Sequence, residues 1–175
     1  MRMILKGEDC GFSWSASHLL PGHTKCSRIH GHNYMMDIEI ESKQLDDHGM
    51  IVDFIEIKKY IRSMIEDFDH RLMLPGLVFN NNNTSKMEVI KQMIDNIDLY
   101  KISYLGINDK EKLYFITQSD VVFIDGIDFV TAENLSLYFK NKVIKVIDNM
   151  TKNKDTNNFT VNVAIYEDAG QGAMA

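Results

Sequence analysis

Residues 30–41 of the chain, HGHNYMMDIEIE, decide the fold because two kinds of side chain alternate along them. The even positions carry two histidines, Tyr34 and then apolar residues, and the odd positions beyond Met35 are acidic. Neighbouring side chains of a β-strand point to opposite faces, so this period of two predicts a half-buried strand. We expect the acidic side chains to face water and the histidines to share the apolar face.

A second alternating pattern lies in the segment from about Met3 to Leu20, which precedes this strand. Serines alternate there with apolar residues, which predicts a strand whose inner face carries Phe12, Trp14 and Ala16. His18 ends this strand in the phase of its inner face.

The pattern changes to helical spacing in two later segments. Asp53 and Glu56 form a capping box, and apolar residues then recur on one face of the predicted helix. Thr131 could cap a second helix that runs to about Met150, with Glu133 in its first turn, where negative charge suits the helix dipole. Strands and helices together predict an α+β protein.

Shorter elements complete the prediction. A short helix is expected around residues 86–94, and residues 112–125 are expected to form a hairpin with a polar turn at 118–120. The last strand is predicted for residues 159–167, where apolar and polar side chains alternate again. A tail of small residues, GQGAMA, follows it.

The composition is that of a globular protein with one domain. At 175 residues the chain is long enough to bury a substantial core, and its 45% apolar and 25% charged residues are ordinary values. A net charge of −6 argues against general nucleic-acid binding. A small anionic substrate stays possible, because it needs only a local basic patch.

Other features favour a cytoplasmic protein. The first residues, MRMILKGEDCG, contain charge and glycine before any apolar run develops, so no secretory leader is predicted. No apolar stretch approaches the roughly 18 residues of a membrane span, so no membrane partner is expected. The two cysteines, Cys10 and Cys26, do not suggest a disulfide framework and fit a reducing compartment.

His30 and His32 are two residues apart on the predicted strand, so their side chains can reach one point in space. Zinc takes imidazole nitrogens at about 2.0–2.1 Å, and such a pair supplies two of them. His18 is the favoured third ligand; His23 competes, but it lies in a loop after Pro21 and its direction is open. The alternative is a chance pair of core histidines. Three histidines in phase at neighbouring strand ends favour the metal site.

Three neutral histidines leave a fourth coordination position open, which is typical of catalytic rather than structural zinc. A metal ion there could polarise a substrate oxygen. Cys26 lies in the loop that leads into the strand, with Lys25 and Arg28 beside it, and nearby positive charge favours the thiolate. The alternative is an inert cysteine that acts as a small hydrophobic residue.

Two further acidic residues are candidates. Asp69 could orient and charge the imidazole of His70, which could then take a proton from a thiol or a hydroxyl. An Asp-His pair at a helix end is also commonly a solvated cap. Glu167 ends the last predicted strand and could accept paired hydrogen bonds from an amino-pyrimidinone ring, or be an ordinary surface carboxylate.

Six motifs span nearly the whole chain in the order seen in one enzyme family. They are FSWSASHLL, KCSRIHGHNY, GMIVDF, DFDHRLMLP, TAEN and VAIYEDAGQGA. The chain resembles the 6-pyruvoyl-tetrahydropterin synthase family, which includes the 6-carboxytetrahydropterin synthases of 7-deazaguanine biosynthesis. The resemblance implies an α+β tunnelling fold, in which a four-stranded antiparallel sheet carries two helices on one face.

The resemblance also implies an assembly. Three subunits would join their sheets into a barrel, and two such trimers would stack into a homo-hexamer. Sites of this family lie between subunits, so Cys26 and His70 of one working site could come from different chains. The chain would be a single domain, residues 1–175, with an insertion at about 76–125 relative to compact members.

Residue roles carry over from the family motif by motif. By this resemblance, the zinc ligands would be His18, His30 and His32. The proton-abstracting thiolate and the two residues that assist it would be Cys26, Asp69 and His70. The residue that anchors the pterin ring and the two near that ring would be Glu167, Thr131 and Glu133.

The implied substrate is 7,8-dihydroneopterin triphosphate. Zinc would hold its side-chain hydroxyls while Cys26 shuttles protons and triphosphate leaves. The carboxy branch also loses acetaldehyde and yields 6-carboxy-5,6,7,8-tetrahydropterin, and the short Cys-x-x-x-His spacing favours this branch. Three alternatives stay open: a pyruvoyl product, an aldolase-like cleavage for a folate-type route, and a non-catalytic pterin-binding paralogue. Hydrolysis by a metal-bound water would leave the adjacent thiol unexplained.

Overall fold

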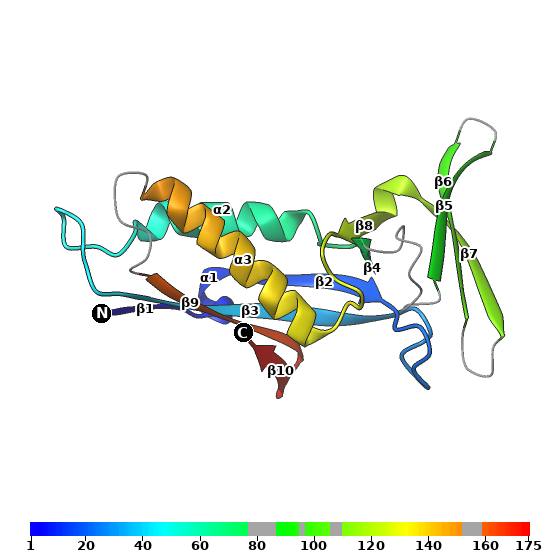
Figure 1. The fold of residues 1–175 in the computed structure, drawn as a ribbon, viewed down its shortest axis with the longest axis horizontal. Helices are drawn as coiled ribbons and strands as arrows, with labels where there is room; N and C mark the ends of the chain where they lie inside the picture. Colours follow the sequence, from blue (N-terminus) through cyan, green and yellow to red (C-terminus); the bar gives the residue numbers. More distant parts are fainter. Residues whose placement is uncertain (77–86, 95–96, 106–109, 152–158) are drawn as a thin grey trace. The chain divides into compact units, whose positions relative to one another are not determined.

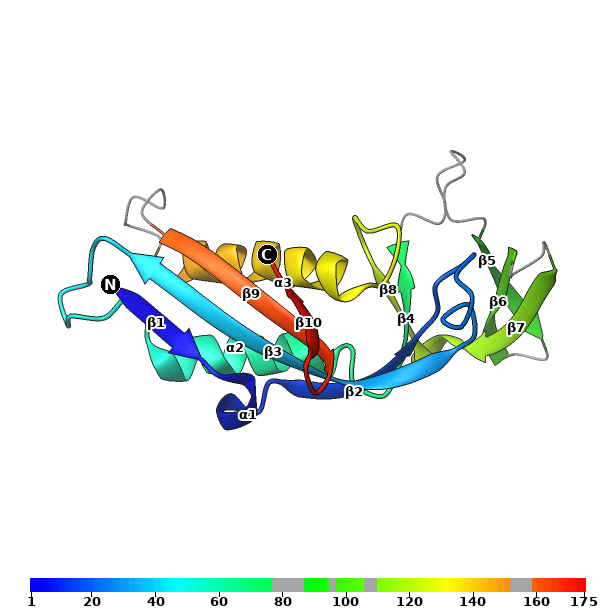
Figure 2. The ribbon, with the colours of Figure 1, turned by 90° about the horizontal axis from the view of Figure 1, so that it is seen from below.

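The computed structural model describes residues 1–76, 87–94, 97–105, 110–151 and 159–175. The chain forms two compact units, each made of several segments. The first contains residues 1–14, 33–67 and 132–175, and the second contains residues 15–32 and 68–131. Figures 1 and 2 show the elements coloured along the chain. The range of the expected insertion, 76–125, falls within the second unit. We propose that the two units together form the single domain expected from the family resemblance.

The first unit contains an antiparallel arrangement of strands centred on β3 (His30–Ser42), whose residues 30–32 belong to the second unit. This strand pairs with β1 (Arg2–Leu5) and with β9 (Phe159–Asp168), and β9 pairs in turn with β10 (Gln171–Met174). The two long strands confirm those predicted from the alternating patterns at 30–41 and 159–167.

The tail of small residues forms strand β10, which the sequence analysis did not predict. It lies antiparallel to β9, with Ala173 opposite Ile165. A Cβ atom on Gly172 would lie only 2.5 Å from the carbonyl oxygen of Ile165. The close approach of the two strands therefore requires glycine at this position, which is why a tail of small residues pairs here.

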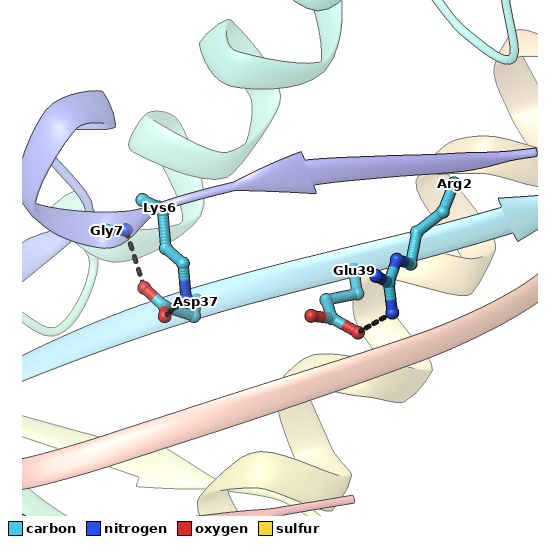
Figure 3. A network of polar contacts seen from close by, with 5 residues as sticks. All are labelled: Arg2, Lys6, Gly7, Asp37 and Glu39. Carbon is cyan, nitrogen blue, oxygen red and sulfur yellow. Dashed lines mark hydrogen bonds and ion pairs between the residues drawn. The ribbon is translucent and has the colours of Figure 1, made fainter.

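Asp37 on β3 does not face water as predicted. Its carboxylate is buried and accepts hydrogen bonds from Lys6 Nζ at 2.6 Å and from the Gly7 amide at 2.8 Å. Gly7 begins the short helix α1 (Gly7–Cys10), so the carboxylate ties β3 to the segment that follows β1, as Figure 3 shows. The prediction was wrong at Asp37 because alternation within one strand does not reveal which segment covers its outer face. It holds at Glu41, which is exposed.

Helix α2 (Phe54–Glu66) begins where the capping box predicts. The Asp53 carboxylate accepts hydrogen bonds from the amides of Ile55 and Glu56 at 2.7 and 3.1 Å. The buried face of the helix carries residues at helical spacing, Ile57, Ile61 and Ile65. The predicted amphipathic helix is therefore confirmed.

Helix α3 (Ala132–Met150) begins directly after Thr131 and has Glu133 in its first turn, as predicted. Figures 1 and 2 show α2 and α3 on the same face of the sheet formed by β1, β3 and β9. None of the helices in the described part of the chain has both the length and the apolar character needed to cross a membrane.

In the second unit, the sheet to which β2 (Ser13–His18) and β3 belong has a parallel part. β4 (Leu72–Pro75) lies between β2 and β8 (Val121–Ile124), and it is parallel to both. The pairing aligns Leu72 with Ser17 of β2 and with Val121 of β8. The expected four-stranded antiparallel sheet is therefore not confirmed.

A second, antiparallel sheet in this unit has three strands. β6 (Ile97–Leu105) lies between β5 (Met87–Ile94) and β7 (Glu111–Thr117). β5 occupies the segment where a short helix was expected, so that prediction was wrong. Val89 is buried while Ile90 beside it is exposed, which is the period of a strand. Pairing with β6, which lies outside the segment itself, decides its conformation.

β7 and β8 do not form the hairpin expected at 112–125. The polar turn is present as a single 3₁₀ turn, η3 (Gln118–Asp120), at the predicted position. However, β7 pairs with β6 and β8 pairs with β4, so the two strands belong to different sheets. A local turn pattern does not determine which partner each flanking strand takes.

Apolar side chains from the two sheets form one core in the second unit. The buried members are Leu19, Leu72, Leu74, Met87, Val89, Ile102, Tyr104 and Val121. This core packs the three-stranded sheet of β5, β6 and β7 against β4, β8 and Leu19, the residue after β2.

Candidate metal centre

Three histidines of the second unit come together at the ends of two strands. His18 is the last residue of β2, and His30 and His32 are alternate residues at the start of β3, so these two point to the same side. Gly31 lies between them and against β2, where a Cβ atom would be 3.2 Å from the carbonyl oxygen of Ala16. Glycine thus allows the close approach that brings His18 beside the other two histidines.

The geometry of the three histidines fits one metal ion. Their ligating nitrogens all lie within 4.8 Å of one another, and the Nε2 atoms of His18 and His30 are 3.1 Å apart. Two nitrogens bound to the same tetrahedral zinc ion would be about 3.3 Å apart. The ring centroids of the three pairs lie 4.4, 5.2 and 5.1 Å apart. These residues could therefore hold a metal ion.

Backbone carbonyls fix the other ring nitrogens of two of these histidines. His18 Nδ1 lies 2.6 Å from the carbonyl oxygen of Val130, and His30 Nδ1 lies 2.8 Å from that of Arg28. A carbonyl oxygen only accepts, so each Nδ1 carries a proton, and in the neutral form of each ring the Nε2 lone pair is available to a metal ion. Metal-binding histidines commonly have such partners, which set the orientation of the ring.

His18 is buried, with 2% of its surface exposed. Burial is the main reason that the pKa of His18 falls to about 4; the hydrogen bond to Val130 opposes this shift, and the charges of His30 and His32 add to it. The ring is therefore neutral at pH 7, which is the protonation state that binds a metal ion.

Cys26 lies half-buried in the loop between β2 and β3 and forms no disulfide. Its amide donates to Nδ1 of His23 at 3.2 Å, and its carbonyl oxygen accepts from the Leu20 amide at 2.7 Å. His23 therefore shapes the loop. Among the residues that the structure describes, His18 and not His23 completes the histidine cluster, and Cys26 is not a member of it.

The residue after Cys26 is held by side chains that the sequence analysis did not single out. The carbonyl oxygen of Ser27 accepts hydrogen bonds from the hydroxyl of Tyr104 on β6 and from Lys112 on β7. Val130, whose carbonyl holds His18, was also missed. No sequence pattern marks such a carbonyl, because every residue has one.

Asp69 and His70 form a hydrogen-bonded pair in the turn that follows α2 in the chain. Asp69 Oδ2 lies 2.9 Å from His70 Nδ1, and Asp69 Oδ1 accepts from the Ser15 amide at 2.8 Å. Burial raises the pKa of Asp69, but the hydrogen bonds from Ser15 and His70 outweigh it and hold this pKa below its usual value. The carboxylate is therefore charged at neutral pH and can orient the imidazole.

The backbone of His70 is left-handed, with a φ of 58°. Few residues other than glycine adopt this conformation, and they concentrate at functional sites. The His70 amide donates to the Ser15 carbonyl at 2.7 Å, so β2 holds both Asp69 and His70 by its backbone. The imidazole itself is 81% exposed. The turn with this left-handed residue therefore leaves the His70 ring exposed on the surface of the second unit.

The three predicted substrate residues lie outside the histidine cluster. Thr131 ends the second unit, whereas Glu133 and Glu167 belong to the first, on α3 and near the end of β9. Burial raises the pKa of Tyr34, and the charge of Glu167 raises it further. Tyr34 stacks on Trp14, with ring centroids 5.2 Å apart. The charge of Glu167 therefore influences the buried Tyr34 of its own unit.

The fold and the histidine cluster define an α+β protein with a candidate metal site. The chain matches the model of the 6-pyruvoyl tetrahydropterin synthase family over residues 10–175. A protein of Methanocaldococcus jannaschii named putative 6-carboxy-5,6,7,8-tetrahydropterin synthase is 31% identical, over 99% of this chain and 94% of its own length. The 6-carboxy-5,6,7,8-tetrahydropterin synthase of Rickettsia typhi is 29% identical over 88% of each chain. The chain belongs to the 6-pyruvoyl tetrahydropterin synthase family.

Solved structures share this fold. The crystal structure of 6-pyruvoyl tetrahydropterin synthase from Plasmodium vivax matches with a TM-score of 0.75 and 22% identity, over 100% of this chain and 96% of that chain. The 6-pyruvoyl tetrahydropterin synthase of Plasmodium falciparum matches over the same shares with a TM-score of 0.76 and 18% identity. These structures show the fold, and the family expected from the six motifs is confirmed by the family model and the relative of Methanocaldococcus jannaschii.

Proposed function

We propose that this chain is a zinc-dependent carbon–oxygen lyase that converts 7,8-dihydroneopterin triphosphate to 6-carboxy-5,6,7,8-tetrahydropterin. The proposal is carried by the histidine cluster, in which two Nε2 atoms lie 3.1 Å apart and both Nδ1 atoms bond to backbone carbonyls. Neutral imidazoles in this arrangement suit zinc, and three protein ligands leave a position for substrate. Bound zinc would supply Lewis acidity at the substrate's side-chain oxygens.

Cys26 is the proposed proton-transfer group. It lies in the chain between His18 and His30, on the loop that joins two ligand-bearing strands. As a thiolate, its sulfur takes a carbon-bound proton from the substrate side chain and returns a proton later in the reaction. The half-buried position leaves part of the residue accessible to a substrate.

Asp69 and His70 assist this transfer. The Asp69 carboxylate fixes the His70 ring through the 2.9 Å contact at Nδ1, which leaves Nε2 to exchange protons. The His70 side chain is 81% exposed, as suits a residue that serves the site of a neighbouring subunit. From the family resemblance, we propose a homo-hexamer built from two trimers, with Cys26 and His70 of one site supplied by different chains.

Glu167, Thr131 and Glu133 are the proposed pterin-binding residues. A carboxylate can accept two parallel hydrogen bonds from the amino group and ring N–H of an amino-pyrimidinone, and we assign this role to Glu167. The relatives are named tetrahydropterin synthases, which supports a pterin as the ligand.

The carboxy product is favoured by the relatives. Those named 6-carboxy-5,6,7,8-tetrahydropterin synthase are 31% and 29% identical over most of the chain, whereas the two Plasmodium synthases are 22% and 18% identical. One water is consumed, and triphosphate and acetaldehyde leave. The pyruvoyl product is the second candidate because the solved structures carry that name.

The test is to incubate the zinc-loaded protein with 7,8-dihydroneopterin triphosphate and to identify the products by mass spectrometry. We expect 6-carboxy-5,6,7,8-tetrahydropterin with acetaldehyde, loss of both after chelation, and recovery on adding zinc. A pyruvoyl or hydroxymethyl pterin would assign the chain to another branch. Absence of any product with zinc bound would contradict the lyase and favour a pterin-binding role.

A further inference from the structure

The three-stranded sheet of the second unit contacts the loop that carries Cys26. Ser27, the next residue, has only 1% of its surface exposed. Its carbonyl oxygen accepts hydrogen bonds from the Tyr104 hydroxyl and from Lys112 Nζ, the latter at 3.3 Å. A buried carbonyl that loses its partners is destabilised, so these two donors hold the Ser27 peptide in place.

Tyr104 and Lys112 form one rigid anchor. They lie directly opposite each other on β6 and β7, and Lys112 Nζ is 5.7 Å from the centroid of the Tyr104 ring. Tyr104 is 1% exposed, and its ring stacks on Tyr114 with centroids 6.1 Å apart. Burial, and then the hydrogen bond with Tyr114, raises the pKa of Tyr104. The hydroxyl therefore keeps its proton and can donate it to Ser27.

Ser27 lies between the two parts of the candidate site. On one side, the Cys26 amide donates to His23. On the other side, the Arg28 carbonyl accepts from Nδ1 of His30 and sets the orientation of that ring. A shift of the Ser27 peptide would therefore displace the thiol and turn a metal-binding ring at the same time.

We propose that Tyr104 and Lys112 are positioning residues for the reaction at the histidine cluster. They hold the Ser27 carbonyl from β6 and β7, and so set the place of the Cys26 thiol and the orientation of His30. The inference rests on the proposed function, because it takes Cys26 as the proton-transfer group. The proposal gives the sheet of β5, β6 and β7 a role in turnover. Neither Tyr104 nor Lys112 is proposed to touch the substrate.

The first test removes each of the two hydrogen-bond donors to Ser27 and, as a control, the hydroxyl of another tyrosine on β6. Tyr104→Phe keeps the ring, Lys112→Met keeps the length of the side chain, and Tyr100→Phe is the control on the same strand, where the ring packs edge-on against Phe123. We expect kcat to fall about 5-fold in each single variant and about 20-fold in the double variant, as for one and two lost hydrogen bonds. KM should stay unchanged, and Tyr100→Phe should match the wild type.

The second test follows the thiol directly and needs no turnover. In a Cys10→Ala background, Cys26 is the one remaining cysteine of the sequence, and its alkylation by iodoacetamide can be timed. Loosening the loop should expose this half-buried thiol, so we expect the Tyr104→Phe, Lys112→Met double variant to react at least about 5-fold faster. Lys112→Arg keeps a cationic donor, so this single variant should have the wild-type alkylation rate and the wild-type kcat, unlike Lys112→Met.

The outcomes separate the inference from the proposed function. Lower kcat with faster alkylation in the donor variants alone supports the inference. Unchanged kcat and alkylation in the double variant would overturn it, and so would equal losses in Tyr100→Phe, because the effect would then be general destabilisation. Should the wild type show no turnover, the proposed function fails, and the alkylation rates alone decide whether the anchor positions Cys26.

Discussion

The rings of His18 and His30, two candidate metal ligands, are oriented by backbone carbonyls. Each ring uses Nδ1 on a carbonyl oxygen, of Val130 and Arg28 respectively, and each Nε2 remains for the cluster. Side chains ordered during folding lose less conformational freedom on binding, so pre-oriented ligands bind more tightly. The cluster is therefore a preorganised site.

Separate substitutions of His32, a proposed zinc ligand, and of Cys26, the proposed proton-transfer group, should distinguish metal binding from turnover. His32→Ala should lose zinc and activity, because two imidazoles remain. Cys26→Ala should keep its zinc and its fold but lose turnover. Metal content after dialysis, measured by inductively coupled plasma mass spectrometry, and product formation test both variants. Full zinc occupancy in the first variant would refute the ligand assignment, and normal turnover in the second would remove the thiol from the mechanism.

The left-handed backbone of His70 makes a separate prediction about stability. His70→Ala should lower the free energy of unfolding by about 1 kcal/mol, because alanine adopts a positive φ reluctantly. His70→Asn should be nearly neutral, since asparagine tolerates this conformation. Urea unfolding of both variants measures the difference. Equal stability of the two would show that the backbone conformation is not maintained in solution.

The lowered pKa of Asp69 predicts a pH dependence. A carboxyl group whose pKa is lower in the folded state stabilises the fold above its unfolded pKa of about 3.9, and this contribution is lost as the pH falls through the folded value. Wild type should therefore be more stable than Asp69→Asn at pH 7, with the difference shrinking in acid. Urea midpoints of both proteins from pH 7 downwards measure it. A difference independent of pH would contradict the charged interaction.

At the scale of elements, close packing of β2 and β3 depends on Gly31. A Cβ atom on Gly31 would lie 3.2 Å from the Ala16 carbonyl oxygen, which is tighter than an ordinary contact, so the missing side chain lets the two strands approach. Gly31→Ala should therefore weaken zinc affinity roughly 10-fold, and Gly31→Val more, because the strands must separate and move His18 from the other two ligands. Competition with a zinc indicator measures the series. Affinity that does not fall with side-chain size would show that the strands are not held this closely.

Strands with strict alternation could be predicted from the sequence alone. β2 buries one face, and β3 and β9 do so over most of their length, so their pattern carries the information. β5 was mistaken for a helix because its conformation depends on pairing with β6, which a local pattern does not contain. The expected hairpin at 112–125 failed for the same reason, since β7 and β8 take partners in different sheets.

The candidate site was predictable to the same extent. His18, His30 and His32 follow from strand phase, and the structure brings them together. Tyr104 and Val130 were not predictable, because they act on or through backbone carbonyls across sequence separations of 77 and 112 residues. Asp37 shows the opposite error, since its pattern indicated a surface position and the structure buries it.

At the scale of the molecule, the proposed metal site and the proposed pterin anchor belong to different units. The three histidines lie in the second unit and Glu167 in the first. Glu167→Gln should therefore weaken pterin binding while zinc content stays unchanged, because an amide accepts fewer hydrogen bonds and carries no charge. Calorimetric titration with a dihydropterin, beside metal analysis, tests this. Unchanged affinity would place the anchor elsewhere.

Through Val130, the His18 ring is connected to Thr131. The Val130 carbonyl oxygen, 2.6 Å from His18 Nδ1, belongs to the residue just before Thr131, which we propose contacts the substrate. Any displacement of Thr131 when a ligand arrives is passed through one peptide link to the imidazole. Movement at Thr131 would then also change the hydrogen bond that orients the His18 ring.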